Sequence, residues 1–236
     1  MIVYIELEHF RLRHQSAKLG HRFETRQLQI KHRLEEISNE PCLIVHYTLI
    51  SPALIHNAGA KAVIISGHNT AYEYYPEETL AGLRAVYREA AWPILGFCAG
   101  FQRMAQTYGG QIAPMGSLLV PDLPPPTADV DLSSTSFEQD TQQERGFTPV
   151  RILQEHPLLA DVGQEAVFFQ MHAWEVKSIP EEFEVLAESS VCGIQAIAHK
   201  SAPLFGTQFH PEQYDTVHPD GRRVLENFFK IAKITI

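Results

Sequence analysis

The sequence predicts an α/β fold, an open and mostly parallel twisted sheet flanked by helices. Short apolar segments alternate with helical ones through the first part of the chain, as parallel strands joined by right-handed crossovers require. A Gly-x-Cys-x-Gly stretch at residues 96–100 then joins one of these strands directly to a helix. A sharp turn of this kind lies at the carboxyl end of a strand, where open α/β sheets bind their ligands.

The elements of the first half follow from their composition in chain order. Strands are expected at residues 2–7, 43–46, 62–66 and 94–97. Helices are expected at residues 8–37, 51–57, 76–91 and 101–108. The third of these helices begins with Pro76 and carries two glutamates in its first turn, which suits the positive end of the helix dipole.

The second half of the chain is richer in strands. They are expected at residues 148–153, 167–170, 184–188, 193–198 and 203–208. Residues 221–234 predict a closing amphipathic helix, whose inward face carries Val224, Leu225, Phe228 and Phe229. The length suits one large domain, so we interpret residues 1–236 as a single domain.

Two segments do not fit this alternation. Residues 121–145 hold three successive prolines, several acids and a Ser/Thr run, which is typical of a flexible insertion; a lid or partner-docking arm is the alternative. Residues 8–37 are rich in basic residues, glutamine and histidine, but their histidines lack the i,i+4 spacing of a helical metal site. We therefore expect a solvated helix face there, with a basic face that docks a partner as the alternative.

Composition argues against several classes of protein. The formal net charge of −9 at pH 7 argues against a nucleic-acid partner, because phosphate binding favours a basic surface. No apolar stretch is long enough to span a bilayer, and the pattern of a secretory leader is not seen. The three cysteines are odd in number and widely spaced, which suits a reducing, cytoplasmic location rather than a disulfide framework.

Cys98 is the candidate nucleophile. Gly96 and Gly100 lie two positions to either side of it, where a sharp turn leaves no room for larger side chains. The start of the following helix places partial positive charge beside the sulfur, which favours the thiolate. The backbone N–H of Ala99 is then placed to stabilise an oxyanion. A small, buried apolar cysteine is the alternative interpretation.

A base and its orienting group lie far downstream of the nucleophile. Residues 202–209 predict a buried strand that ends in His210-Pro211-Glu212. Residues two apart in an extended segment point the same way, so Glu212 can orient His210. With Cys98 they supply the nucleophile, base and orienting group of covalent acyl transfer. The His-x-Glu pair lacks the Cys-x-x-Cys that a zinc deaminase adds, so we predict no metal and no cofactor.

The two motifs together resemble those of the class I, triad-type glutamine amidotransferases. The Gly-x-Cys-x-Gly-x-Gln turn at residues 96–102 and the Gln-Phe-His-Pro-Glu strand end at residues 208–212 match the motifs of that family. The resemblance covers most of the chain from about residue 62 onward and implies a flavodoxin-like layout. It also implies that Cys98, His210 and Glu212 form a triad that hydrolyses glutamine.

The resemblance carries further site residues over to this chain. Gly67 would supply a second oxyanion N–H beside that of Ala99, and His68 stands where the family often has another glycine. Gln102 would bind the amino-acid end of glutamine. The segment whose backbone helps to hold glutamine is matched by His172, Ala173 and Trp174.

The resemblance implies an enzyme that hydrolyses glutamine through a cysteine thioester and delivers ammonia to a separately made synthetase. Glutamine is the expected substrate and a synthetase subunit the possible partner. The C-terminal pattern from residue 209 to Gly221 is most similar to the amidotransferase part of GMP synthase. Two alternatives stay open: a γ-glutamyl hydrolase that acts alone, and a non-catalytic regulatory or binding protein that keeps the fold.

Overall fold

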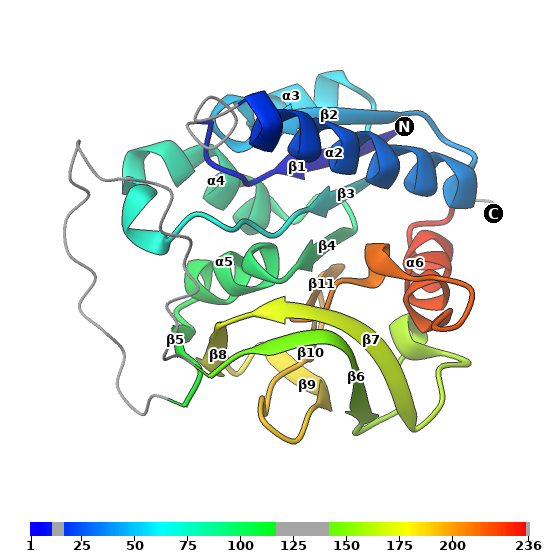
Figure 1. The fold of residues 1–236 in the computed structure, drawn as a ribbon. Coiled ribbons are helices and arrows are strands. Elements are labelled where there is room, and N and C mark those ends of the chain that lie inside the picture. Colours follow the sequence, from blue (N-terminus) through cyan, green and yellow to red (C-terminus); the bar gives the residue numbers. More distant parts are fainter. Residues whose placement is uncertain (11–16, 117–141, 235–236) are drawn as a thin grey trace.

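Strand order in the sheet explains how distant segments of the chain meet. The structure is a computed structural model that describes residues 1–10, 17–116 and 142–234 (Figure 1). One sheet has nine strands in the order β2-β1-β3-β4-β11-β10-β9-β6-β7, and β5 and β8 form a separate antiparallel pair. The pairs from β2 to β11 are parallel and those from β11 to β7 are antiparallel. The predicted fold class, an open and mostly parallel sheet flanked by helices, is confirmed.

The strands of the first half lie close to their predicted positions. They are β1 (Ile2–Glu6), β2 (Cys42–His46), β3 (Ala62–Ile65) and β4 (Ile94–Phe97). Every residue of β1, β3 and β4 is buried, because helices cover both faces of this part of the sheet. Successive side chains of β1 therefore enter two separate cores, with Tyr4 in one and Val3 in the other.

The helices form a layer on each face of the parallel strands (Figure 1). They are α2 (Ala17–Ser38), α3 (Pro52–Asn57), α4 (Ala81–Glu89), α5 (Ala99–Thr107) and α6 (Asp220–Ile231). α2 and α6 share one core, to which they contribute Leu34 and Phe228, and α3, α4 and α5 share the other. The helix predicted at residues 76–91 begins with a 3₁₀ turn at Glu77–Leu80, which leads directly into α4.

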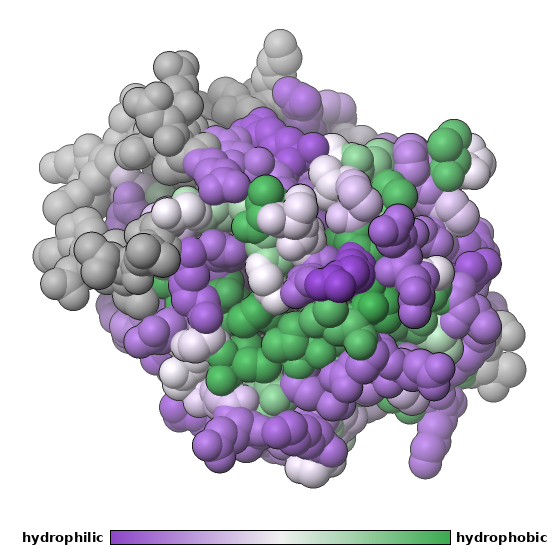
Figure 2. All heavy atoms as spheres, turned by 90° about the horizontal axis from the view of Figure 1, so that it is seen from below, coloured by the Kyte–Doolittle hydropathy of each residue, from purple (hydrophilic) through white to green (hydrophobic). Residues whose placement is uncertain are grey.

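The second half extends the sheet with antiparallel strands. They are β5 (Gln111–Pro114), β6 (Glu144–Ile152), β7 (Glu165–His172), β8 (Trp174–Ser178), β9 (Phe183–Glu188), β10 (Ala196–His199) and β11 (Leu204–Thr207). β11 returns to the parallel centre and pairs with β4, so the segments that follow these two strands lie side by side. None of the described α-helices covers the lower face of the β6–β7 end, where Figure 2 shows apolar side chains surrounded by polar ones.

The two segments that did not fit the alternation of strands and helices, residues 121–145 and 8–37, are described to different extents by the structure. The predicted insertion at residues 121–145 lies outside the described residues except at its C-terminal end, where β6 has already begun at Glu144. The basic segment forms α2, which is not solvated on all sides, because Ile30, Leu34 and Ile37 are buried in the core. No described helix is long and apolar enough to cross a bilayer. The interpretation of residues 1–236 as one domain stays a prediction.

Candidate active site

The carboxyl ends of four neighbouring strands bring the candidate residues together. β1, β3, β4 and β11 are adjacent in the sheet, and the segments that leave them carry Glu8, Gly67, Cys98 and His210. Cys98 and His210 both lie directly against Gly67. A Cβ placed on this glycine would lie 3.2 Å from both Cys98 Cβ and His210 Cε1. The candidate nucleophile and the candidate base therefore meet at one point on the sheet edge, and the catalytic roles of Cys98, His210 and Glu212 stay a prediction.

Cys98 lies in a strained turn between β4 and α5. Its φ of 49° and ψ of −110° are values that non-glycine residues rarely adopt. A Cβ on Gly96 would lie 2.7 Å from the carbonyl carbon of Gly100, and a Cβ on Gly100 would lie 2.5 Å from the carbonyl oxygen of Ile65. These close backbone contacts require glycine at both positions and hold Cys98 in its unusual conformation.

The Cys98 sulfur faces the start of α5 and the end of β7. The residue is 6% exposed, and its Sγ lies 3.9 Å from the carbonyl oxygen of Met171. Its backbone N–H donates to the carbonyl of Thr207 at the end of β11, over 2.7 Å. The N-terminus of α5 favours negative charge at the sulfur, because the first N–H groups of a helix carry partial positive charge.

His210 and Glu212 form a buried hydrogen-bonded pair. His210 Nδ1 donates to Glu212 Oε1 over 2.8 Å, and the residues are 5% and 3% exposed. Burial acts to lower the pKa of His210, but the Glu212 carboxylate and hydrogen bonds with Cys98 and Glu212 raise it to about 9. Burial acts to raise the pKa of Glu212, but His210 holds it below its ordinary value. The imidazole therefore stays protonated through neutral pH beside an ionised carboxylate.

The His210 ring lies beside the candidate nucleophile Cys98. Nε2 is buried and has no hydrogen-bond partner in the described part of the chain, and the His210 side chain interacts with that of Cys98. The backbone N–H of His210 donates to the carbonyl of Phe169 in β7 over 2.9 Å, which fixes the residue against the antiparallel half of the sheet. The ring can therefore exchange a proton with a group bound at Cys98.

Two backbone amides flank the sulfur. Gly67 follows β3 and Ala99 begins α5, and neither N–H makes a backbone hydrogen bond among the described residues. Ser66 fixes the conformation of Gly67, because its hydroxyl donates to the Gly67 carbonyl over 2.8 Å and accepts from the N–H of Leu7 over 2.9 Å. Free amides beside a nucleophile suit a developing oxyanion. The role of Gly67 and Ala99 as the oxyanion hole stays a prediction with this geometry in its support.

Glu8 holds the loop that follows Gly67, a role that the sequence analysis missed. It is 1% exposed, and its carboxylate accepts from the N–H of Asn69 and the hydroxyl of Thr70, both over 2.7 Å. The signal that could have found it is its position directly after a buried strand, at the same sheet edge as Gly67 and Cys98. The long charged segment that begins at Glu8 concealed that position.

His68 packs into an aromatic cluster. Its ring lies 4.4 Å from the ring of Tyr75 and 4.8 Å from that of Tyr72, measured between centroids. Burial, together with the positive charge of Arg103, holds the pKa of His68 well below its ordinary value, so the ring is neutral. His68 therefore anchors this loop to the 3₁₀ turn at Tyr72–Tyr74 and to Tyr75 through edge-on and tilted ring contacts.

Gln102 is buried behind the site and has all of its amide atoms in hydrogen bonds. Its Nε2 donates to the carbonyl of Trp174 over 2.7 Å and to Gln208 Oε1 over 2.8 Å, and its Oε1 accepts from the hydroxyl of Tyr72. Gln102 therefore ties α5 to the start of β8. A direct contact between Gln102 and glutamine stays a prediction, and it requires one of these bonds to open.

The other predicted substrate residues lie in the turn between β7 and β8. The ring of His172 is buried, with Nε2 3.0 Å from Glu144 Oε2 and Nδ1 3.1 Å from the carbonyl oxygen of Trp174. Ala173 is also buried, and its carbonyl accepts from the N–H of Met115 over 2.8 Å. These bonds shape the backbone of the turn, whereas contacts of the three residues with glutamine stay a prediction.

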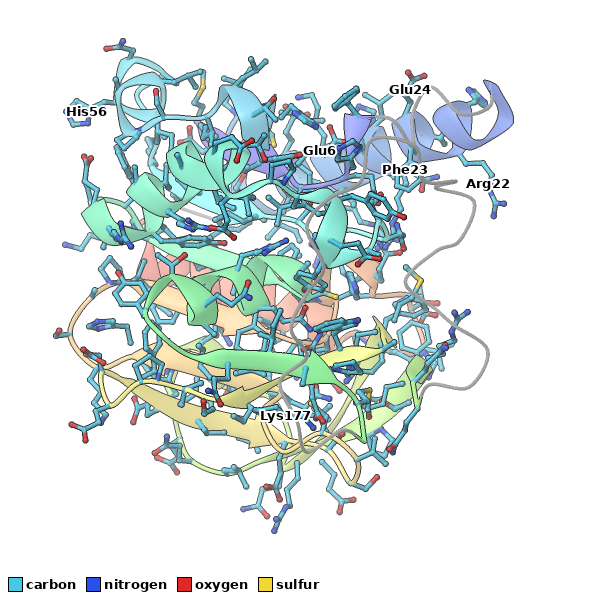
Figure 3. The ribbon with its side chains drawn as sticks, turned by 90° about the vertical axis from the view of Figure 1, so that its left-hand side faces the viewer. Glu6, Arg22, Phe23, Glu24, His56 and Lys177 are labelled. Atoms are coloured by element: carbon cyan, nitrogen blue, oxygen red, sulfur yellow. The ribbon has the colours of Figure 1, made fainter. Side chains whose placement is uncertain are left out.

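α2 covers the triad from the other side, which the expectation of a solvated helix did not include. Arg33 donates from Nη1 to the carbonyl oxygen of Glu212 over 2.5 Å. Arg26 adds positive charge that helps to keep the pKa of Glu212 low, after the larger effect of His210. In Figure 3 the Phe23 label lies on the side of α2 toward the body of the protein and the Glu24 label on the opposite side.

The space beside His210 and Glu212 is narrow in this structure. A cavity of about 30 Å³ adjoins His210, Glu212 and Gly67, which is far below the range of volumes typical of small-molecule sites. A groove of about 610 Å³ lies between the first half of α2 and β7. Three residues line both spaces and therefore separate them: Phe23, Arg26 and Met171. Movement of these side chains would join the groove to the space beside His210.

The remaining reactive groups do not form a second centre of this kind. Burial raises the pKa of Cys42 to about 12 and also raises that of Cys192, so both thiols stay protonated. All three cysteines are free thiols. Within residues 1–10, 17–116 and 142–234, no group of three or more His, Cys, Asp or Glu side chains could hold a metal ion.

Comparison with known sequences gives a family model and named relatives that agree with one another. The chain matches the family model described as glutamine amidotransferase class-I over residues 12–232. It is 35% identical over 141 residues to a subunit of glutamine-hydrolyzing GMP synthase from Methanothermobacter thermautotrophicus, a match that covers 60% of this chain and 61% of that protein. It is 30% identical over 199 residues to the protein of the same name from Methanospirillum hungatei, which covers 84% and 86% of the two chains.

Comparison with solved structures shows the same fold at lower sequence identity. A Thermoplasma acidophilum structure, described as that of a GMP synthase subunit, superposes with a TM-score of 0.70 at 20% identity, over 99% of this chain and 94% of that one. A glutamine amidotransferase from Methylobacillus flagellatus superposes with a TM-score of 0.64 at 15% identity, over 99% and 95% of the two chains.

Proposed function

Because this chain belongs to the class I glutamine amidotransferase family, we propose that it hydrolyses the side-chain amide of glutamine and supplies ammonia to a separate synthetase. The observation that carries the proposal is the strained Cys98 turn, packed against the buried His210–Glu212 pair. The relatives named as subunits of glutamine-hydrolyzing GMP synthase support a synthetase partner of the GMP synthase kind. The free thiols suit a reducing cytoplasm, where we place the reaction.

The first half of the proposed reaction forms a thioester. Cys98 Sγ attacks the carbonyl carbon of the glutamine side chain, and the negative charge that develops on the carbonyl oxygen lies toward the N–H groups of Gly67 and Ala99. The protonated His210 then gives its Nε2 proton to the leaving nitrogen. The carbon–nitrogen bond breaks, ammonia leaves, and the γ-glutamyl group stays on the sulfur.

The second half of the reaction releases glutamate. The neutral His210 accepts a proton from water, the hydroxide attacks the thioester carbonyl, and the carbon–sulfur bond breaks. Glu212 keeps the imidazole oriented in both halves through the 2.8 Å bond to Nδ1, and its charge stabilises the imidazolium. The sulfur leaves as the thiolate, His210 is again protonated, and the site is back in its starting state.

A hydrolase of larger γ-glutamyl compounds is the second candidate. The groove of about 610 Å³ beside Phe23 supports it, because that space could take a leaving group larger than ammonia. The two candidates differ in their substrates. Turnover of γ-glutamyl peptides without turnover of glutamine would favour the second candidate.

The direct test is labelling with a diazo-ketone analogue of glutamine, with the adduct mapped by intact-protein and peptide mass spectrometry. We expect one adduct, on Cys98, whose formation excess glutamine prevents. Cys98→Ala should take up no label and release no ammonia from glutamine, while keeping the circular dichroism spectrum of the unchanged chain. Cys42→Ala is the matched control, because that thiol is buried and protonated, and it should label at the original rate.

Two results would contradict the proposal. One is ammonia release from glutamine that persists in Cys98→Ala. The other is a label that reaches Cys42 or Cys192 as fast as it reaches Cys98, because the site would then lack a selectively reactive thiol.

A further inference from the structure

A second, partly open cavity lies between α4, α5 and the 3₁₀ turn at Glu77–Leu80, and none of the three candidate catalytic residues lines it. It has a volume of about 320 Å³. Three arginines line it together with the polar side chains of Gln106 and Thr107: Arg84, Arg88 and Arg103. Among the described residues around this cavity, Glu77 is the only acid. The cavity therefore concentrates positive charge on a chain whose formal net charge is −9.

The arginines of α4 are arranged so that they repel one another. Arg84 and Arg88 are one turn apart and lie on the same face of the helix, where like charges destabilise. Arg84 pairs with Glu77, whose side chain is 70% exposed, and Arg88 forms no ion pair with any described residue. Burial and the nearby charges of Arg103 and Arg88 hold the pKa of Arg84 below its ordinary value.

Arg103 is a buried cation without an acid partner in the described structure. It is 7% exposed, and its Nε and Nη2 atoms have no hydrogen-bond partner. Its Nη1 donates to Gln106 Oε1 over 3.1 Å, and its guanidinium carbon lies 4.5 Å and 5.3 Å from the ring centres of Tyr72 and Tyr75. The aromatic faces offset part of the cost of burying this charge. Buried charges are otherwise paired, so the geometry calls for an anion.

We propose that the cavity between α4 and α5 binds a phosphate-bearing small molecule through Arg84, Arg88 and Arg103. A guanidinium presents a planar fork of N–H donors that matches phosphate oxygens, and three such groups suit a ligand of charge −2 or more. The amide of Gln106 and the hydroxyl of Thr107 can complete its hydrogen bonds. The volume is at the lower end of the range for small-molecule sites, which fits a compact phosphate group better than a folded partner.

The proposal is independent of glutamine hydrolysis, and its test contains no glutamine. Isothermal titration calorimetry of the full chain with inorganic pyrophosphate, at constant ionic strength, should show one saturable site with a dissociation constant of about 1 mM or lower. The double variant Arg84→Gln/Arg88→Gln removes two cations at the cavity mouth and should raise that constant about tenfold or more.

The matched control is the double variant Arg151→Gln/Arg223→Gln, which removes the same charge from exposed arginines on β6 and α6. It should bind pyrophosphate within about twofold of the original chain, because it changes only the general field of the protein. Pyrophosphate should also raise the melting temperature of the original chain and of this control, but not that of Arg84→Gln/Arg88→Gln.

Three results would overturn the proposal. The first is the absence of saturable pyrophosphate binding, and the second is an equal loss of affinity in both double variants. The third is equal affinity for malonate, a compact dicarboxylate, because the cavity would then be a general anion or carboxylate site rather than a phosphate site.

Discussion

The two sides of the active site are held by different kinds of contact. On the sheet side, Cys98 is fixed by glycines whose backbones touch neighbouring backbone atoms so closely that no Cβ fits. On the helix side, α2 reaches the triad through long side chains, such as Arg33 on the Glu212 carbonyl and Phe23 over the cavity. Backbone contacts of the first kind cannot slide, whereas side chains can change rotamer. We therefore expect the rigid side to hold the reacting groups in place and the movable side to control access to them.

The largest expected effect comes from breaking the rigid side. Gly100→Ala would place a Cβ 2.5 Å from the carbonyl oxygen of Ile65, so β3 and the Cys98 turn must move apart. We expect a loss of about 3 kcal/mol in the free energy of unfolding, measured by urea denaturation, and loss of glutaminase activity in the molecules that stay folded. An alanine that keeps both stability and activity would show that the turn is not rigid.

Gly163→Ala is the matched control for this substitution. A Cβ at this position meets no heavy atom closer than 4.0 Å, and the backbone there does not need a positive φ. We expect the free energy of unfolding to change by no more than about 0.5 kcal/mol. The difference between the two alanines then measures the close contact at the turn rather than the general effect of replacing glycine.

A second, smaller effect tests the charge on the rigid side. The pKa of His210 is raised to about 9, chiefly by Glu212 acting against burial. As the pH rises through about 9, His210 therefore loses the Nε2 proton that it would give to the leaving nitrogen of glutamine. Glu212→Gln removes the negative charge and should move the alkaline fall in activity to lower pH. The value of kcat should also decrease by about 100-fold, because the imidazolium loses its stabilising partner.

A pH profile of ammonia release distinguishes this role from a structural one. A merely destabilised variant would lose activity at all pH values without moving the alkaline limb. If the alkaline fall in activity stays at the same pH in Glu212→Gln, Glu212 does not control the protonation of His210. That result would contradict the proposed role of the His210–Glu212 pair.

The smallest effect is expected on the movable side. Phe23→Ala removes a ring that lines both the small cavity and the outer groove, so the diazo-ketone should label Cys98 about threefold faster or more. Leu28→Ala is the control, because Leu28 lies on the same helix, is 50% exposed and lines neither space. Equal labelling rates in the two variants would show that α2 does not limit access.

The residues on the rigid side of the site could be predicted from the sequence. The rigid side depends on residues that few other positions require, namely glycines around Cys98 and a His-Pro-Glu strand end, so its motifs are visible in one sequence. The strand positions of the parallel half were predicted because these strands consist almost entirely of apolar residues. The family resemblance drawn from these motifs agrees with the family model.

The movable side could not be predicted in the same way. Arg33 and Phe23 are ordinary residues of a charged helix, and only the packing of α2 beside Glu212 gives them a role. Glu8 is similar, since its buried bonds to residues 69–70 depend on the pairing of β1 with β3. The insertion predicted at residues 121–145 lies mostly outside the described residues and stays a prediction.

The cavity of about 30 Å³ has a consequence for how strongly glutamine binds. If only an open minority of molecules can admit the substrate, the apparent dissociation constant equals the intrinsic one divided by the open fraction. An open population of about 1% would weaken apparent binding about 100-fold without any change at the triad. A partner that bound only the open form would restore this affinity, and glutamine would in turn tighten the complex by the same factor.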